Sequence, residues 1–263
     1  MNRYVIAAIA TLLLAGPAGA FDLSGLPEPL VTDRPDFTES PSVVPSGHFQ
    51  VEGGATFTRV EEEDADTFGE ILVRIGLGKG LEARIGVPSY ERLDAQAGTI
   101  SGYGDPSLGF KLRLTPDPPS EKTPGRPEAA LILSTSIPEG DEELSDGAWQ
   151  PEARVALSWG LGARFSLSSN VGYAYPEDPG SGDRFDQFLA SLSLGIALTD
   201  RLGAFVEGYG FSGETVDGSE TTYMDAGLTW LVANDLQLDV RAGRGFNDAD
   251  PDWFVGAGAA LRW

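Results

Sequence analysis

Residues 191–198 read SLSLGIAL, so a leucine or an isoleucine stands at every second position and a serine, glycine or alanine stands between. Successive side chains of a β-strand point to opposite faces, so this stretch predicts a strand with one apolar face and one face of small or polar residues. The pattern recurs along the chain, for example in LGFKLRL at 108–114 and FVGAGAALRW at 254–263. We count twelve such units, in the ranges 48–60, 67–77, 81–90, 102–115, 128–138, 149–160, 163–175, 185–199, 202–213, 221–232, 236–246 and 252–263.

These units have the length and alternation of strands in an outer-membrane β-barrel, and their number is even, as single-chain bacterial barrels require. All five Trp residues lie at or beside predicted strand ends, and four Tyr residues lie near others: Trp149, Trp159, Trp230, Trp253 and Trp263, with Tyr90, Tyr103, Tyr175 and Tyr223. Such positions are typical of aromatic girdles at the two membrane interfaces, whereas a soluble β-sandwich would bury Trp in mid-strand as often. We therefore predict an all-β fold, an antiparallel transmembrane β-barrel of about 12 strands.

The connections between the predicted strands differ in length and charge. Four of them are tight, at 78–80, 160–162, 199–201 and 233–235, whereas those after odd strands are mostly longer and acidic. Short turns of such barrels face the periplasm and long loops face outward. We place the Pro-rich connection at 116–127, which is long, on the periplasmic side as an exception. The acidic extracellular loops are either solvated tips, a mouth that attracts cations, or carboxylates that bind lipopolysaccharide phosphates through divalent ions.

The first twenty residues precede the barrel pattern. Arg3 is followed by an apolar run from Tyr4 to Ala15 and by small residues ending at Ala20, which predicts a cleaved signal peptide at 1–20. A membrane-anchoring helix would need about 20 apolar residues, more than this run has. We therefore expect export to the cell outer membrane, with an N-terminal segment at 21–47 and the barrel at 48–263.

The composition excludes several classes of function. The 263 residues include 40 Asp and Glu against 18 Lys and Arg, and this net charge of −22 rules out a nucleic-acid partner bound through a basic face. The chain has no cysteine and a single histidine, His48, which removes thiolate and multi-His metal sites and Cys nucleophiles. His48 is also the only candidate base for a serine hydrolase, and it lies at the start of the first strand. We predict no enzyme activity, no catalytic residue, no metal and no cofactor.

Charged residues of both signs occur on the strand faces that point away from lipid. We predict that the following side chains line a pore: Glu52, Arg74, Arg84, Lys111, Arg113, Arg154, Asp239 and Arg241. Two interpretations remain open. The charges either form a ladder of pairs that fills a narrow barrel, or they line a water-filled conduit and tune its selectivity.

The N-terminal segment at 21–47 lacks the strand pattern and contains prolines at 27, 29, 35, 41 and 45. Within it, VTDRPDFTES at 31–40 is too polar for lipid and suits the charges expected in the lumen. We expect this segment to fold into the periplasmic mouth as a partial plug, with Asp33, Arg34 and Asp36 as candidate contact residues. The alternative is a flexible tether.

Four motifs carry a resemblance to a known family: TDRPDFTES at 32–40, PSGHFQVEGG at 45–54, GYGDPSLGFKLRL at 102–114 and GRGFNDADPDWFVGAGAALRW at 243–263. In this order they resemble the bacterial outer-membrane family described as "putative MetA-pathway of phenol degradation", a transporter family. The resemblance covers roughly residues 32–263. It implies an outer-membrane barrel that passes small compounds, with aromatic or hydrophobic ones as candidates, and no catalytic residues carry over.

We therefore predict a porin-like channel or transporter barrel for the passive uptake of small solutes. The alternative is a structural or adhesive barrel without an open pore, which anchors lipopolysaccharide through its acidic loops. The expected partners are outer-membrane lipid and lipopolysaccharide, a small-molecule solute, and the outer-membrane assembly machinery. The last is expected because the chain ends on Trp263 in phase with Leu261, which resembles the terminal strand that this machinery reads.

Overall fold

A computed structural model describes residues 26–60, 63–115, 125–178, 180–216, 218, 220–247 and 251–263. The predicted signal peptide and most of the connection at 116–127 lie outside the described residues. The strands are β1 (Phe49–Val60), β2 (Glu63–Gly78), β3 (Leu81–Gly86), β4 (Tyr90–Ala95), β5 (Gly98–Tyr103), β6 (Ser107–Arg113), β7 (Glu128–Ser136), β8 (Gln150–Gly160), β9 (Phe165–Ala174), β10 (Gln187–Ala197), β11 (Leu202–Phe211), β12 (Thr221–Ala233), β13 (Leu236–Gly245) and β14 (Trp253–Arg262). In the part of the chain that the structure describes, no helix is long and apolar enough to cross a membrane.

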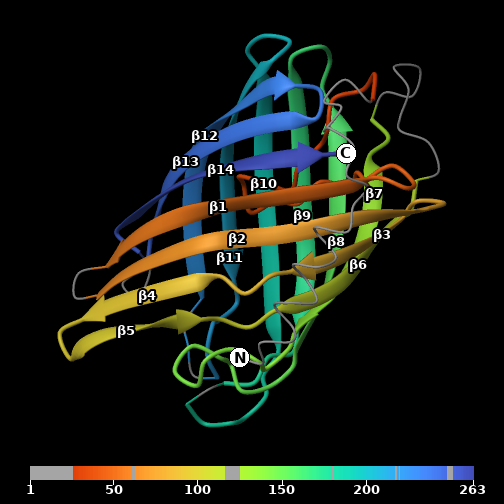
Figure 1. The fold of residues 1–263 in the computed structure, drawn as a ribbon. Helices are drawn as coiled ribbons and strands as arrows, with labels where there is room; N and C mark the ends of the chain where they lie inside the picture. Colours follow the sequence, from red (N-terminus) through yellow and green to blue (C-terminus); the bar gives the residue numbers. More distant parts are fainter. Residues whose placement is uncertain are drawn as a thin grey trace.

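The strands form one antiparallel sheet that closes on itself (Figure 1). β1 pairs with β14 on one side, where Gln50 lies opposite Arg262, and with β2 on the other side. Two positions around the barrel are each occupied by two short strands instead of one long strand. β3 and β4 together occupy the position next to β2, and both pair with β2. β5 and β6 together occupy the following position, where β5 pairs with β4 and β6 pairs with β3. Counted as positions, the fourteen strands make a closed barrel of twelve, as the alternation predicted.

The structure corrects the prediction of loops at 61–66 and around 91–101. β2 begins at Glu63, and β4 and β5 form a hairpin that extends from the barrel at the lower left of Figure 1. Asp66 of β2 lies 2.7 Å from the guanidinium of Arg59 in β1 and opposite Arg92 of β4. Opposite charges that face each other across strands stabilise a sheet. The acidic composition, which is typical of a loop, here belongs to paired strands.

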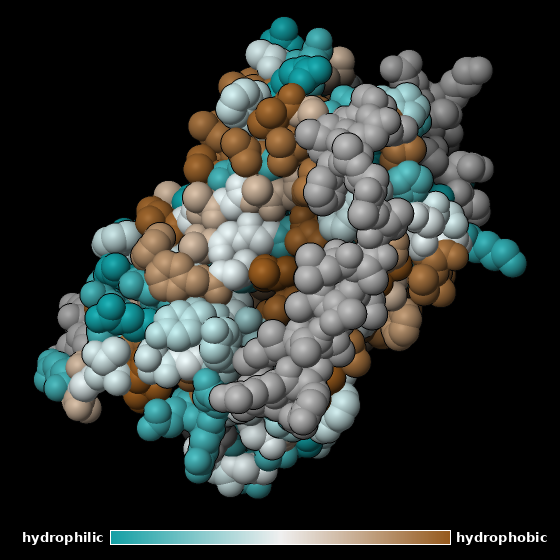
Figure 2. Space-filling view, in the orientation of Figure 1, coloured by the Kyte–Doolittle hydropathy of each residue, from teal (hydrophilic) through white to brown (hydrophobic). Residues whose placement is uncertain are grey.

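Burial in the barrel is the reverse of burial in a soluble protein. In β10, Leu192 and Leu194 are 53% and 38% exposed, whereas Ser191 and Ser193 are only 6% and 3% exposed. Figure 2 shows hydrophobic side chains over the barrel wall and hydrophilic ones towards the end of the β4–β5 hairpin. Leucines on the outside and serines on the inside are favourable where the wall is surrounded by hydrocarbon.

The barrel has two rims, which we name by their connections. The turn rim holds the short connections at 78–80, 161–164, 198–201 and 234–235, and the loop rim holds longer ones, including 137–149 and 175–186. The turn at Gly78-Lys79-Gly80 has φ values of +89°, +54° and +76°. Glycine reaches this left-handed region at little cost, which explains the two glycines in the turn.

Exposed tryptophans lie near both rims, as girdles require. At the loop rim, Trp149 directly precedes β8 and Trp253 begins β14, whereas Trp230 lies near the turn rim, and all three are exposed. Tyr223 was expected in the same girdle, and this prediction is wrong. Its side chain is buried and stacks on Tyr209 of the neighbouring strand, because Tyr223 shares the inward face of β12 with Asp225.

Candidate functional site in the barrel lumen

The N-terminal segment enters the barrel at the turn rim, crosses the lumen and returns to β1. Leu30 N donates to Asn234 O at 2.7 Å in the turn between β12 and β13, and Gly47 N donates to Gly76 O of β2 at 2.9 Å. Between these points the segment contacts β1, β2, β3, β6, β8, β9, β10, β11 and β13. A segment that reaches strands on every side of a closed barrel lies inside it. We call residues 30–44 the lumen segment.

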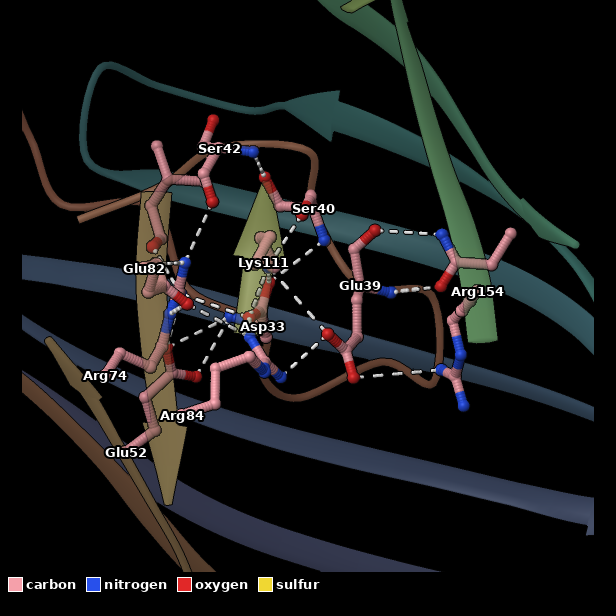
Figure 3. A network of polar contacts seen from close by, with 12 residues as sticks. Asp33, Glu39, Ser40, Ser42, Glu52, Arg74, Glu82, Arg84, Lys111 and Arg154 are labelled. Atoms are coloured by element: carbon pink, nitrogen blue, oxygen red, sulfur yellow. Dashed lines mark hydrogen bonds and ion pairs between the residues drawn. The ribbon is translucent and has the colours of Figure 1, made fainter. Parts of the chain in front are cut away.

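Asp33 binds the lumen segment to one half of the wall (Figure 3). Its carboxylate lies 2.6 Å from Arg84 Nη1, 2.7 Å from Lys111 Nζ and 3.3 Å from Arg74 Nη1. Burial by itself raises the pKa of Asp33, but the charges of Arg74, Lys111 and Arg84 outweigh it and hold the pKa well below its usual value. Asp33 is therefore ionised and paired with cations from β2, β3 and β6.

Arg74 of β2 lies at the centre of this arrangement. It has no exposed surface, and it donates to Glu82 through Nε and Nη2, both at 2.9 Å, and to Glu52 through Nη1 at 2.8 Å. The carbonyls of Val31 and Ser42 in the lumen segment accept further bonds at 3.1 and 2.9 Å. A buried guanidinium requires such a full set of acceptors. We call the following residues the anchor cluster: Asp33, Glu52, Arg74, Glu82, Arg84 and Lys111.

Glu39 links the anchor cluster to the opposite wall. Its carboxylate lies 2.7 Å from Arg84 Nη2 and 3.8 Å from Arg154 Nη1 of β8. Its backbone exchanges two hydrogen bonds with the Asn170 side chain of β9, at 2.8 and 2.9 Å. The chain beyond Asp33 is thereby stretched across the lumen.

Residues 35–38, which we call the tip, are held by carboxylates and hydroxyls. Glu207 of β11 accepts hydrogen bonds from Phe37 N at 2.6 Å, from Thr38 N at 2.8 Å and from Thr38 Oγ1. Ser193 Oγ of β10 donates to Asp36 Oδ2 at 3.1 Å. Burial, and then repulsion from Glu207, raises the pKa of Asp36 well above its usual value. The tip thus contains a carboxyl group that is costly to ionise in place.

Of the residues predicted to line a pore, the structure brings five together around Asp33 and Glu39: Glu52, Arg74, Arg84, Lys111 and Arg154. Asp239 lies elsewhere on the inner wall, where its carboxylate is 3.4 Å from Arg34 Nη2, and Arg34 Nη1 also donates to Glu70 at 2.8 Å. Arg241 of β13 donates to a threonine hydroxyl of β1 at 3.2 Å. Arg113 lines a separate cavity of 580 Å³ at the turn rim.

Aromatic rings gather inside the lumen beside the tip. Phe37 stacks on Tyr209, with ring centroids 4.4 Å apart and planes at 12°, and meets the edge of Phe211 at 5.4 Å. Tyr209 stacks in turn on Tyr223, at 4.8 Å and 11°. The guanidinium of Arg154 lies over the Phe37 ring, 4.7 Å from its centroid. The tip therefore places one aromatic ring between a cation and a wall of aromatic side chains.

The sequence analysis did not single out Phe37, Tyr209 or Phe211. A signal for the two wall residues exists, because Tyr209 and Phe211 have the same parity along β11 as Glu207, a charged residue that is unfavourable on a lipid-facing side. Val206 has the opposite parity and is 45% exposed on the outer face. No local pattern indicates that Phe37 meets them, since it lies in a non-strand segment far away in the sequence.

The lumen contains a cavity on each side of the lumen segment. A cavity of 610 Å³ extends from the turn rim to the tip and is lined mainly by small residues of β8 to β12, including Ser158, Ser168, Ser193 and Gly195. A second cavity of 350 Å³ lies on the other side of Glu39, beside β2, β3 and β6. The lumen segment therefore lies between two spaces inside the barrel.

Together, the closed barrel, the apolar outer wall and the polar lumen define a β-barrel of the outer-membrane class. The family model described as "Putative MetA-pathway of phenol degradation" matches residues 32–263, and the chain belongs to this family.

Solved structures of outer-membrane channels have the same fold. The chain is similar to an outer membrane channel from Pseudomonas putida F1, with a TM-score of 0.67 and 14% identity over 84% of this chain and 97% of that one. It is also similar to the NanC porin, with a TM-score of 0.53 and 13% identity over 81% and 98% of the two chains. For the KdgM porin the TM-score is 0.51, with 8% identity over 81% and 98%. No curated protein matches the sequence.

Proposed function

We propose that the chain is a passive outer-membrane channel for small solutes, and that the lumen segment closes it in the conformation described here. Membership of the family and the fold shared with outer-membrane channels support this function. The observation that carries it is the divided lumen. The anchor cluster occupies the half beside β1, β2, β3 and β6, where a cavity of 350 Å³ remains, whereas a cavity of 610 Å³ extends along β8 to β12 up to the tip.

The proposed route runs along β8 to β12 and is obstructed by the tip. On this side the wall contributes serines and glycines, which leave space and offer hydrogen bonds without a fixed charge. The tip is bound to the wall here by hydrogen bonds to Glu207, Ser191 and Ser193 and by the contacts of the Phe37 ring with Tyr209, Phe211 and Arg154. Moving residues 35–38 would leave the pairs of Asp33 intact, so opening requires no rearrangement of the anchor cluster.

Small aromatic or hydrophobic compounds are the solutes that we propose. The family description names phenol degradation, and the rings of Phe37, Tyr209, Phe211 and Tyr223 give the route an aromatic wall.

A reversible crosslink tests this route, because the chain has no cysteine of its own. Thr38 Oγ1 lies 2.7 Å from Ser191 Oγ, so the double variant Thr38→Cys/Ser191→Cys should form a disulfide that ties the tip to β10. We expect single-channel conductance in planar bilayers to fall when this variant is oxidised and to recover after reduction.

The matched control ties two wall strands together and leaves the tip free. Val155 of β8 and Val171 of β9 are directly paired and exposed on the outer face, so Val155→Cys/Val171→Cys introduces the same chemistry into the wall away from the route. Its conductance should not respond to oxidation. If the disulfide of Thr38→Cys/Ser191→Cys is shown to form and the conductance of this variant is equally insensitive to it, the proposed route is contradicted.

The second candidate function is a structural barrel that anchors lipopolysaccharide, with no open pore. The completely paired anchor cluster favours it, because ion pairs of this kind fill a lumen rather than conduct. A wild-type barrel that is folded and silent in bilayers, and that binds lipopolysaccharide only with divalent cations, would support this function over the channel.

The outer-membrane location with a cleaved signal peptide also belongs to the proposal. We expect the mature protein in the outer-membrane fraction to begin at Phe21, as N-terminal sequencing would determine. An N-terminus at Met1 would contradict cleavage after Ala20.

A further inference from the structure

We propose that Phe37 occupies a ring-binding site on the lumen wall, and that a neutral single-ring aromatic solute with a hydrogen-bond donor, such as a phenol, binds there in its place. The site consists of the face of Tyr209, the edge of Phe211 and the carboxylates of Glu207 and Asp225. This inference rests on the proposed channel function and names the site at which the solute displaces the tip.

The wall side of the site is rigid and does not depend on the tip. Tyr209 and Tyr223 are directly paired residues of β11 and β12, and their rings stack on each other. Phe211 belongs to the same face of β11 and meets Tyr223 edge to face at 6.4 Å. If residues 35–38 leave, these three rings keep their positions, because the barrel strands hold them. An aromatic surface then becomes available to a solute.

Phe37 fills this surface as a planar ligand would. Its ring is parallel to Tyr209 at stacking distance and perpendicular to Phe211, which are the two favourable arrangements of aromatic pairs. Arg154 adds a guanidinium over the ring and also donates to Phe37 O at 3.4 Å. Phe37 is the only aromatic residue in the sequence VTDRPDFTES at 31–40, so the tip presents a single ring at this point.

Hydrogen-bond acceptors beside the ring indicate a ligand with a donor. Glu207 now accepts two backbone N–H bonds and one hydroxyl bond from the tip, and all three are lost when the tip moves. Asp225, directly opposite Glu207 in the ladder, is 4% exposed, and its carboxyl group interacts with that of Glu207. Buried acceptors without a donor are unfavourable, so a phenolic hydroxyl would supply a donor to Glu207 in place of those that leave with the tip.

The charge around the site selects among aromatic solutes. When residues 35–38 have left, the carboxyl groups of Glu207 and Asp225 remain beside the position and disfavour a ring that carries an anionic group. Of the cations beside the site, Arg154 is already bound to Glu152 at 2.9 Å through two of its nitrogens, and the charge of Arg241 acts on Glu207 and Asp225. We therefore expect binding to decrease from a phenol, to a ring without a donor, to an aromatic carboxylate.

The test measures binding directly, so that it does not require conduction. The refolded mature barrel in detergent micelles is titrated with 4-fluorophenol, fluorobenzene and 4-fluorobenzoate and followed by ¹⁹F NMR, with empty micelles as the blank. Removing the competing ring in Phe37→Ala should tighten 4-fluorophenol binding about three- to tenfold. Tyr209→Ala should weaken binding by a similar factor, and Tyr209→Phe should restore it.

Phe188→Ala serves as the matched control, because this ring is 59% exposed on the outer face and the same atoms are removed. It should bind 4-fluorophenol as the wild type does. Unchanged binding in both Phe37→Ala and Tyr209→Ala, or stronger binding of 4-fluorobenzoate than of 4-fluorophenol, would overturn the ring site.

The two proposals fail separately. Conduction that responds to the Thr38–Ser191 crosslink, without any effect of Phe37→Ala or Tyr209→Ala on phenol binding, would refute the ring site and leave the channel standing. A silent barrel that binds 4-fluorophenol with the expected response to both variants would refute the channel function and retain the ring site.

Discussion

Arg74 makes five hydrogen bonds from a position without exposed surface, and its partners come from the barrel wall and from the lumen segment. Such a residue is costly to bury and still more costly to lose, since Glu52 and Glu82 would remain as buried charges without their cation. Single residues of the anchor cluster therefore determine whether the lumen segment stays in the barrel.

We expect Arg74→Met to lower the free energy of unfolding by about 3–5 kcal/mol, the range for breaking a buried ion pair from one side. Urea unfolding in micelles, followed by tryptophan fluorescence, measures this change. The control is Arg92→Met, because Arg92 is paired with Asp94 at 2.8 Å but its side chain is 52% exposed, and solvent screens that pair. If the free energy of unfolding falls by the same amount in Arg74→Met and Arg92→Met, burial does not determine how much an ion pair of this barrel stabilises it.

Asp36 gives the lumen segment a dependence on pH. Because its pKa in the folded protein is raised by burial and by the neighbouring carboxylates Glu207 and Asp225, the folded state binds the proton more tightly than the unfolded chain does. This contribution to stability is fully present below the ordinary carboxyl value of about 3.9 and is lost as the pH rises through the raised pKa. Asp33, whose pKa is lowered, instead loses its contribution only in strong acid.

The open probability of the wild-type channel should therefore increase as the pH rises above the ordinary carboxyl value of about 3.9 and through the raised pKa of Asp36. Asp36→Asn should flatten this increase by keeping the group neutral. Single-channel recording over a series of pH values tests the prediction. Asp200→Asn, in an exposed turn, should retain the wild-type profile. An Asp36→Asn channel that still opens with rising pH as the wild type does would assign the effect to another group.

At the scale of elements, the turn between β2 and β3 depends on left-handed backbone at three successive residues. We expect Gly80→Ala to destabilise the barrel by about 1 kcal/mol, because φ at Gly80 is +76° and a side chain is strained in that region. Gly160→Ala removes a glycine at the end of β8, where an added Cβ meets nothing within 4 Å, and should be neutral or slightly stabilising. If Gly80→Ala and Gly160→Ala unfold at the same urea concentration, the turn between β2 and β3 has no special role in stability.

The β4–β5 hairpin shows how an element can be missed when composition is used alone. Its outer strand pairs only with β4 within the described residues, and Asp94 of β4 accepts from Thr99 of β5 at 2.6 Å. Charged residues stand two positions apart at Asp64 and Asp66 of β2 and at Arg92 and Asp94 of β4, where other strands have apolar residues. A search restricted to apolar periodicity assigns them to loops.

At the scale of the whole molecule, the net charge of −22 gives an open channel a preferred sign of ion. We expect cation selectivity at low salt that fades towards 1 M, because the Debye length falls from about 30 Å at 0.01 M to about 3 Å at 1 M. Reversal potentials under potassium chloride gradients measure this preference. Anion selectivity at low salt would show that the arginines and lysine of the lumen, rather than the acidic loops, control permeation.

The sequence by itself determined the barrel. Alternation in stretches such as residues 191–198 requires only neighbours along the chain, so the twelve positions around the barrel, the outward leucines and the inward charges could be read locally. It also indicated that residues 31–40 are suited to the lumen, since a polar segment beside a barrel has few other stable places.

Only the tertiary structure decided what the lumen residues contact. Asp33 meets Lys111, Arg34 meets Asp239, and Phe37 stacks on Tyr209, at separations of up to 205 residues. Such contacts arise when the barrel closes, because closure brings strands from the whole chain around one axis. The pattern along a strand states which face a side chain occupies. It does not state which side chain lies opposite across the lumen, and the anchor cluster and the aromatic site depend on that.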